Sequence, residues 1–476
     1  MSIHLFLRVQ NQTTPIIATT KSTLKKKLQV TLSQRLVEKA EVLILDGCAI
    51  LRVINWPNKG TVADFVNGFT RNVMKRVASQ DTYLIFDRYF DFSIKSGTRA
   101  ARAGDEASRR HRLQLHTPLP PQTVVLTVTE NKVQVIDLIC QDLIQKAQDE
   151  PNEHSLVITF TESVPVVIQG GIVFRRQDLM TCHEEADVII IQQMVKAAES
   201  GVKRINIVCA DTDVFVLLLH FYAKLNLTCR LTMEGPSAER TTIDIGATAS
   251  EHGQLLSQLP AAHALSGCDT VAQYFGVGKS TVIKVLKSGV EWQKLTKDIG
   301  DIIEEATAFM AACYGVQSLV TSNMSEVRGE IWSRRMGRKN VSKAPELKSL
   351  PPSKEAFEEN VKRAHIQTAI WKSALNSDPP ALDPVEFGWE RDERTRCLIP
   401  VTLKPNVSVA PPEVLEMIRC CCATNTPCST ALCGCFTAHL SCTMFCGCHG
   451  EAHCRNDHTR WVDDCDNVVQ GDLFED

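Results

Sequence analysis

Four short apolar runs alternate with helical patterns between residues 41 and 235 of this 476-residue chain. The runs are EVLIL (41–45), TYLIF (82–86), RINIVCA (204–210) and VFVLLL (214–219), and a helical pattern covers 184–200. Continuous apolar runs of this length are typical of strands that are buried on both faces. Their alternation with helices predicts an α/β fold, with a mainly parallel sheet flanked by helices.

The pattern changes after residue 255. Residues 255–315 have helical patterns, and one more helix is expected at 353–375. Residues 320–418 are more polar and contain several prolines, which indicates linkers. The last twenty residues are rich in Asp and Glu, as flexible tails are. The domains expected are an N-terminal extension (1–40), a principal domain (41–300), a helical region with linkers (301–418), a cysteine-rich module (419–456) and an acidic tail (457–476).

Composition and charge narrow the class of protein. A hydrophobic content of 44% supports a real core, and a net charge of −3 confines any nucleic-acid contact to local basic patches. No apolar run is long enough to span a bilayer and no signal peptide begins the chain, so we expect a soluble intracellular protein without membrane association. Eleven of the nineteen cysteines lie between Cys420 and Cys465. Without a secretory signal, this crowding favours zinc thiolates over disulfides.

Several predicted strands end in an acidic residue, and more acids follow at the start of a helix and in the motif SGCDT. The set is Asp46, Asp87, Glu185, Asp187, Asp211, Asp213 and Asp269. The carboxyl ends of parallel strands meet at one edge of a sheet, so these side chains are expected to converge. Asp211 and Asp213 would share a face if their strand continues. Clustered carboxylates need cations to stay ionised, and oxygen ligands fit two Mg²⁺ or Mn²⁺ ions. Ordinary loop and cap residues are the alternative for any single acid.

The segment GVGKST at 276–281 is similar to the end of a phosphate-binding P-loop. The required first glycine is missing, because that position is Gln273, and no apolar strand precedes it. A helix–hairpin–helix at 264–287 fits better, with LSGCDTVAQYF as the first helix and its lead-in, GVGK as the hairpin and STVIKVLK as the second helix. Gly276 and Gly278 permit a tight turn, and backbone N–H groups with Lys279 would bind a DNA phosphate.

The order of the acids resembles the flap endonuclease branch of the PIN-like nucleases, over about residues 41–300. The resemblance implies that these acids bind two metal ions and hydrolyse DNA phosphodiesters at branched or 5′ flap structures. IKSGTRAARAG resembles the gateway helix of that family, which implies that Lys95 and Arg102 contact the scissile phosphate. SGCDT…GVGKST resembles its helix–three-turn–helix unit. The chain departs from the family in the 45 residues before Asp46 and in the long segment from Asp87 to Glu185, where we expect a different arch or extra sheet.

The cysteine cluster has a regular spacing, C-x-C-x5-C-x4-C-x-C-x6-C-x3-C-x-C-x5-C. Its members are Cys420, Cys422, Cys428, Cys433, Cys435, Cys442, Cys446, Cys448 and Cys454. The spacing resembles the tesmin-type CXC domain, which implies about three Zn²⁺ ions with shared thiolates. Cys421 and Cys465 are left over, and Cys421 could replace Cys420 or Cys422.

The DNA-binding members of that domain family place a tyrosine beside the middle C-x-C. Here the position is Leu432, and residues 420–454 contain no Lys or Arg. A nucleic-acid ligand requires a basic footprint, so a protein partner or a structural role is an equally good interpretation of this module.

The leading hypothesis is a nuclear, Mg²⁺-dependent DNA nuclease that carries a zinc module. Two alternatives stay open. One is a non-catalytic chromatin or nucleic-acid-binding protein built on a degenerate nuclease scaffold. The other is a zinc-dependent interaction hub whose large domain supports the CXC module.

Overall fold

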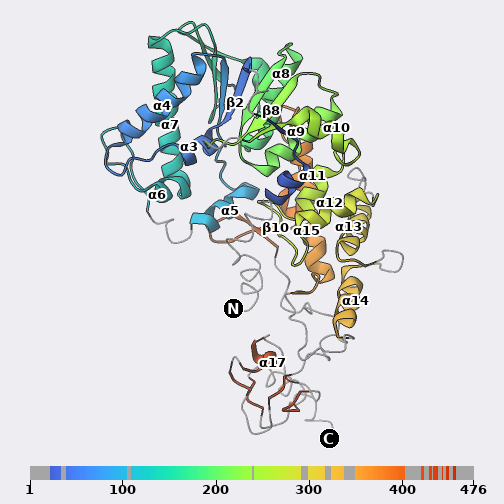
Figure 1. Cartoon of the computed structure of the whole chain (residues 1–476). Coiled ribbons are helices and arrows are strands. Elements are labelled where there is room, and N and C mark those ends of the chain that lie inside the picture. Colours follow the sequence, from blue (N-terminus) through green and yellow to red (C-terminus); the bar gives the residue numbers. More distant parts are fainter. Residues whose placement is uncertain are drawn as a thin grey trace, which may run out of the picture. The chain divides into compact units, whose positions relative to one another are not determined.

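The computed structural model describes residues 22–33, 39–103, 109–237, 241–290, 298–316, 323–336, 349–401, 420–422, 428–430, 432–437, 442, 446–449 and 454–456, without the side chains of 100–103. The predicted acidic tail, with Cys465, lies outside these residues. The chain divides into two compact units, Thr14–Phe309 with Glu358–Val401, and Met1–Thr13 with Met310–Phe357 and Thr402–Asp476 (Figure 1). No described helix is long and apolar enough to cross a membrane.

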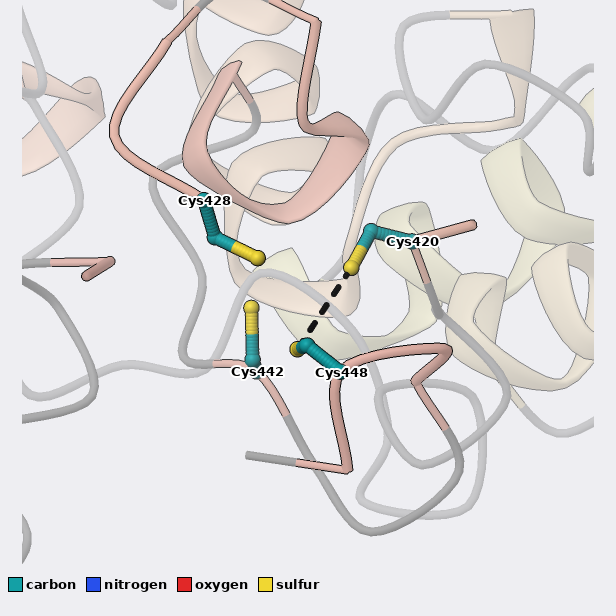
Figure 2. Close-up of side chains that lie close together, drawn as sticks. All are labelled: Cys420, Cys428, Cys442 and Cys448. Carbon is teal, nitrogen blue, oxygen red and sulfur yellow. Dashed lines mark hydrogen bonds between the residues drawn. The ribbon is translucent and has the colours of Figure 1, made fainter. Parts of the chain in front are cut away.

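The smaller unit contains helix α14 (Met324–Met336) and the cysteine cluster, part of which is drawn in Figure 2. Trp332 of α14 is buried, and the buried guanidinium of Arg328 donates to the carbonyl of Pro351. Within the cluster, the short helix α17 (Gly434–Thr437) follows Cys433 directly.

A nine-stranded sheet forms the centre of the larger unit, in the order β1-β9-β8-β7-β2-β3-β4-β5-β6. The five central strands, which run parallel, are β8 (Arg230–Glu234), β7 (Arg204–Val208), β2 (Val42–Asp46), β3 (Asp81–Ile85) and β4 (Leu156–Thr159). Antiparallel strands complete both edges: β9 (Thr242–Asp244) and β1 (Thr31–Leu32) on one side, β5 (Val166–Gln169) and β6 (Ile172–Arg175) on the other. The predicted α/β class with a mainly parallel sheet is confirmed.

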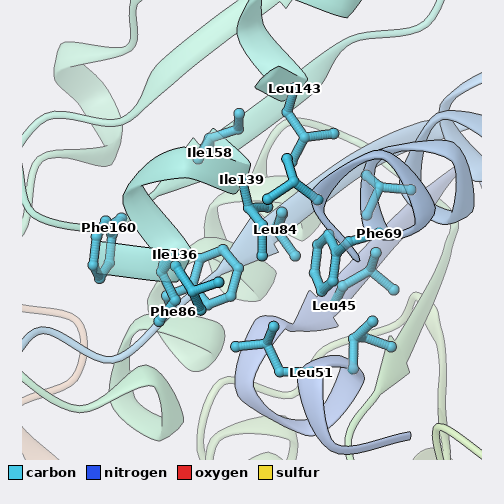
Figure 3. Close-up of a cluster of buried hydrophobic side chains, with 14 of the residues drawn as sticks. Leu45, Leu51, Phe69, Leu84, Phe86, Ile136, Ile139, Leu143, Ile158 and Phe160 are labelled. Carbon is cyan, nitrogen blue, oxygen red and sulfur yellow. The ribbon is translucent and has the colours of Figure 1, made fainter. Parts of the chain in front are cut away.

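Side chains alternate along each strand, so the apolar central strands present an apolar face on both sides of the sheet, and helices cover both faces. Leu43 and Leu45 of β2 face the core that α4 (Val62–Val77) and α7 (Thr129–Asp149) form (Figure 3). Helix α8 (Ala186–Glu199) packs against β2, β3 and β7 and is covered by α9 (Thr212–Lys224). The remaining helices of this unit are α3 (Gly47–Val53), α5 (Ile94–Ala103), α6 (Gln122–Thr127), α10 (Ile245–His252), α11 (Leu259–Leu265) and α12 (Lys279–Lys287). Helices α13 (Ile299–Cys313) and α15 (Lys354–Lys372) cross the unit boundary, and β10 (Trp389–Arg391) pairs with β11 (Leu398–Pro400).

One predicted strand is wrong. Residues 214–219 lie in α9, in which every residue from Thr212 to Phe221 is buried. A helix that is buried all round carries no helical periodicity, so its apolar run cannot be told from a buried strand. The apolar stretches after residue 122 likewise form α6 and α7, whereas the extra sheet expected before Glu185 is formed by β4, β5 and β6.

The predicted N-terminal extension contributes to the larger unit. Residues 22–28 are helical, and the side chains of Leu24 and Leu28 are buried. Strand β1 pairs with β9, and the N–H of Val30 donates to Thr248 Oγ1 at 3.0 Å. The larger unit therefore begins before the expected boundary at residue 41, and it includes the 358–401 stretch that was interpreted as helix and linker.

The structure differs from the predicted helix–hairpin–helix in the first half of that unit. The first helix is α11, which ends at Leu265, so SGCDTVAQYF lies in the connection and not in a helix. Gly276 has a φ of 76°, which favours glycine, and Gly278 is the N-cap of α12. Lys279 is buried, and its ammonium donates to His263 O, Ser266 Oγ and Gly267 O at 2.7, 2.8 and 2.7 Å. The expected phosphate contact of Lys279 is therefore wrong, because its ammonium ties α12 to the end of α11.

Replacing Lys279 with Met should lower the free energy of unfolding by about 3 kcal/mol, because buried acceptors lose a charged donor. Lys287 is exposed on the same helix, so Lys287→Met should stay within about 0.5 kcal/mol of the wild type. Urea unfolding followed by circular dichroism measures both changes. A Lys279→Met variant as stable as the Lys287→Met variant would contradict the internal role of this ammonium.

Candidate metal centre

Three of the predicted acids lie along one edge of the sheet. Asp46 is the last residue of β2 and caps α3, and Asp87 follows β3 by two residues. Asp211 follows β7 and caps α9, where it accepts from the N–H of Asp213 at 2.9 Å. Because β7, β2 and β3 are parallel neighbours, their carboxyl ends bring these acids together.

Two thiols that the sequence did not single out contact this row of acids. Cys209 Sγ donates to Asp46 Oδ2 at 3.1 Å, and Cys48 Sγ donates to Asp87 Oδ2 at 3.7 Å. Burial raises the pKa of Asp46 and the nearby charge of Asp87 adds to this, against the hydrogen bonds from Ala49 N–H and Cys209. The first residue of α3 is Gly47. A Cβ at this position would lie 2.3 Å from the Phe86 ring, so the close packing requires a glycine.

Asp187, Asp211 and Asp213 form the tightest group. Each offers a carboxylate oxygen, and these oxygens lie within 4.8 Å of one another. The pKa of Asp187 is raised well above its ordinary value by burial and by the charges of Asp211 and Asp213, with Lys95 opposing them. The sequence predicted that Asp211 and Asp213 would share a face if their strand continued. The strand does not continue, because β7 ends at Val208 and both acids belong to the start of α9.

Lys95 of α5 connects the remaining acids. Its Nζ lies 3.3 Å from Glu185 Oε2 and 3.9 Å from Asp187 Oδ2. Burial alone would lower the pKa of Lys95, but the charges of Glu185, Asp187, Asp87 and Asp269 outweigh it and raise the pKa well above its ordinary value. Lys95 thus links Glu185, Asp187, Asp87 and Asp269, and Asp187 joins these acids to Asp211 and Asp213.

Two further cations concern this site: Arg102, which the sequence predicted, and Lys25, which it did not. Arg102 lies in α5, but its side chain is outside the part of the chain that the structure describes. Lys25, in the N-terminal helix, donates to Ala210 O at 3.4 Å and interacts electrostatically with Asp211. The segment KSTLKKKLQ that contains Lys25 is basic, but its sequence gives no link to the acids.

Helix α15, which the sequence predicted at 353–375 without a link to the acids, supports two of them. Glu185 accepts from Gln367 Nε2 at 3.2 and 3.3 Å and from Trp371 Nε1 at 3.3 Å. The Trp371 ring stacks on His263, with 5.8 Å between centroids and 18° between planes. His263 Nε2 in turn lies 2.7 Å from Asp213 Oδ1. One helix therefore fixes Glu185 directly and Asp213 through a buried histidine.

The same helix reaches the segment that carries Asp269. Thr270 Oγ1 donates to Gln367 Oε1 at 2.6 Å, and Thr98 of α5 donates to the main-chain oxygen of Asp269 at 3.3 Å. Asn360 exchanges hydrogen bonds with the backbone of Ala272, each 3.1 Å long. The connection between α11 and α12 is thus held at Asp269 and at the residues that follow it.

The cysteine cluster forms a second centre of different chemistry, in the smaller unit. The groups whose Sγ atoms lie within 4.8 Å of one another are Cys420, Cys428, Cys442 and Cys448 (Figure 2), then Cys420, Cys435, Cys442 and Cys446, and finally Cys420, Cys422, Cys428 and Cys433. Cys420 belongs to all three groups, and other members are shared. Burial opposes ionisation of Cys420, but hydrogen bonds from the Cys422 backbone and from neighbouring thiols outweigh it and lower its pKa to about 6.

The module is built from its cysteines. Among the described residues between 420 and 456, the buried side chains are eight cysteines and Asn456. Cys454, the ninth predicted ligand, is buried but outside the three groups, whereas Cys421 is exposed and also outside them. A Cβ at Gly447 would lie 2.6 Å from the Cys422 carbonyl oxygen, so the first and third C-x-C segments approach closely.

The two centres fit different ions. Carboxylate oxygens suit hard divalent cations such as Mg²⁺ and Mn²⁺, and thiolates in groups of four suit Zn²⁺. Burial and the charges of Asp211 and Asp213 raise the pKa of Asp187, and a divalent cation would offset both effects.

Replacing Trp371 with Phe should weaken Mn²⁺ binding at the carboxylates by about tenfold to a hundredfold. The ring still stacks on His263, but the N–H that orients Glu185 is lost. Trp389→Phe is the matched control, because Trp389 is equally buried and its indole N–H has no hydrogen-bond partner. Calorimetric titration with Mn²⁺ measures the affinity, and equal affinities of the two variants would contradict the positioning role of Trp371.

Comparisons with known proteins were made for the sequence and for the fold. No family model matches the sequence, and no curated protein matches it. Among solved structures, the chain is similar to the bacteriophage T5 D15 protein co-crystallised with metal ions, at 11% identity and a TM-score of 0.32 over 68% of this chain and 97% of that chain. It is similar to the catalytic core of Rad2 in complex with a DNA substrate, at 13% identity and a TM-score of 0.34 over 71% and 95%.

A third similar structure is the bacteriophage T5 D15 flap endonuclease in a pseudo-enzyme–product complex with DNA and metal ions, at 12% identity and a TM-score of 0.31 over 68% of this chain and 98% of that chain. TM-scores of this size do not establish shared ancestry or activity. The function is therefore argued from the residues of the site.

Proposed function

We propose that this protein is a metal-dependent phosphodiesterase that cleaves DNA with two Mg²⁺ or Mn²⁺ ions at the carboxylate site. The observation that carries the proposal is the close group of Asp187, Asp211 and Asp213, which Lys95 joins to Glu185, Asp87 and Asp269, from four separate parts of the chain. Their order resembles that of flap endonucleases, so branched or flap DNA in the nucleus is the proposed substrate.

The acids divide into two sets that would hold the ions. Asp187, Asp211 and Asp213 already lie close enough to share one cation. Asp46 and Asp87 at the ends of β2 and β3, Glu185 at the start of α8 and Asp269 after α11 would supply further ligands. When bound, two such ions activate water and stabilise the leaving oxygen of a phosphodiester.

Lys95 supplies a fixed positive charge at the same place. Its ammonium stays protonated at neutral pH because four carboxylates surround it. A phosphate group that approaches the acids meets this ammonium, which stabilises negative charge that develops on the phosphate oxygens. The ion pairs of Lys95 with Glu185 and Asp187 hold its side chain in that position beforehand.

The cysteine module is proposed to bind about three Zn²⁺ ions through shared thiolates. Residues 420–454 contain no Lys or Arg, and Leu432 is 91% exposed next to the middle C-x-C. The lack of cations favours a protein partner over DNA as the ligand of this module.

Asp211→Asn should lower Mg²⁺-dependent cleavage by at least about a hundredfold, roughly 2.7 kcal/mol in activation free energy. Flap, duplex, single-stranded and RNA substrates are compared with purified full-length chain. Asp149→Asn is the control, because Asp149 is exposed at the end of α7, away from the carboxylate site. Cleavage that survives Asp211→Asn would refute the metal assignment, and wild-type protein that binds DNA but cleaves no substrate would support a non-catalytic scaffold.

The purified chain should contain about three zinc ions, released on titration of its thiols. Cys428→Ser should lower the zinc content by at least one ion, because Cys428 is buried and belongs to two of the groups. Cys421→Ser should leave the content unchanged, since Cys421 is exposed. Elemental analysis gives both values, and equal losses in the two variants would contradict the predicted ligand set.

A further inference from the structure

A turn with two exposed aromatic side chains separates Asp87 from the helix that carries Lys95. Phe90 is 44% exposed and Phe92 is 49% exposed. Phe92 also has a φ of 61°, a left-handed conformation that bulky side chains rarely adopt. Both rings are therefore open to a ligand at this turn, and one of them is held there in a strained backbone conformation.

The turn is held firmly against the carboxylate site. Arg88 N donates to the Glu184 carbonyl at 2.8 Å, and Ser93 Oγ donates to Glu184 Oε1 at 2.9 Å. Arg99 bridges the same points, donating to Glu184 Oε1 at 2.6 Å and to the Phe90 carbonyl at 3.0 Å. Because Glu184 precedes Glu185 in the chain, these bonds hold the backbone of the turn next to the segment that carries Glu185.

Cations lie next to this turn. The ring of Tyr89 has the guanidinium of Arg99 at 5.5 Å from its centroid and the ammonium of Lys132 at 5.2 Å. Lys132 also interacts electrostatically with Asp46 and Asp87. Exposed aromatic faces beside cations fit a ligand that offers a flat π-surface and a negative charge within one repeating unit, as a nucleotide does.

We propose that Phe90 and Phe92 form a stacking platform for an unpaired nucleobase adjacent to the phosphate at the carboxylate site. The proposal rests on the proposed function and adds to it the class of substrate. A base offers its face to a side chain only when it has left the duplex stack, so the platform selects single-stranded segments. It imposes no sequence preference, because every base has a π-face.

The test measures the binding of labelled DNA to the full-length chain in EDTA, where cleavage does not contribute. Phe90→Ala and Phe92→Gly should weaken binding of a single strand by about fivefold to a hundredfold, with less than about a twofold change for a duplex of the same sequence. Phe90→Trp should keep single-strand binding. Phe174→Ala is the matched control, because Phe174 is 41% exposed on edge strand β6, which β4 and β5 separate from β3.

Phe92→Gly gives a second readout. Glycine adopts a φ of 61° without strain, so this variant should raise the midpoint of thermal unfolding while it weakens single-strand binding. Unchanged single-strand affinity in both variants, equal weakening for single strand and duplex, or a wild-type chain that binds no single strand would each overturn the platform.

These outcomes separate the platform from the nuclease. Selective loss of single-strand binding in a chain that cleaves nothing supports the platform and contradicts the proposed enzyme activity. Mg²⁺-dependent cleavage that Asp211→Asn abolishes, together with single-strand binding that both Phe variants retain, contradicts the platform and supports the nuclease.

Discussion

Repulsion among buried carboxylates is the constraint that determines how the larger unit arranges the residues around its acids. Desolvation and like charge both disfavour ionised acids, and the raised pKa of Asp187 shows that the two effects act together here. The cluster can stay ionised only with positive charge nearby. Lys95 supplies one such charge from α5, and divalent cations would supply more. The acids therefore favour the binding of cations, at a cost in folding stability.

The structure meets this constraint by giving individual carboxylates their own donors. Asp46 accepts from the thiol of Cys209, Asp213 is paired with buried His263, and Glu185 accepts from Gln367 and Trp371. These donors orient the oxygens before any ion binds, and such support is what gives metal sites their affinity. Because two of the donors lie on α15, the site depends on residues well beyond the segment that supplies the acids.

The sequence predicted the acids but not their supports. Asp46, Asp87 and Asp211 follow apolar runs, and the rule that places strand ends together needs only local patterns. Trp371 and His263 meet through tertiary packing, for which a single sequence contains no signal. The prediction for Lys279 was wrong for a related reason. Its glycine-rich context indicated a phosphate contact, but the end of α11 supplies enough acceptors to enclose the ammonium. The all-buried helix α9 was mistaken for a strand because burial on every side erases periodicity.

The two metal centres stand in opposite relations to folding. The carboxylate site sits on a sheet whose apolar core includes Leu45, Phe69, Phe86 and Ile139 (Figure 3), so the scaffold has a hydrophobic core of its own and the proposed ions are not needed to build it. In the cysteine module, thiols take the place of apolar side chains in the described interior, so the proposed metal ions would replace a hydrophobic core as the source of stability. Chelation should therefore silence the first centre while its fold persists, but unfold the second. The same treatment would separate an interaction carried by the cysteine module from an activity carried by the sheet.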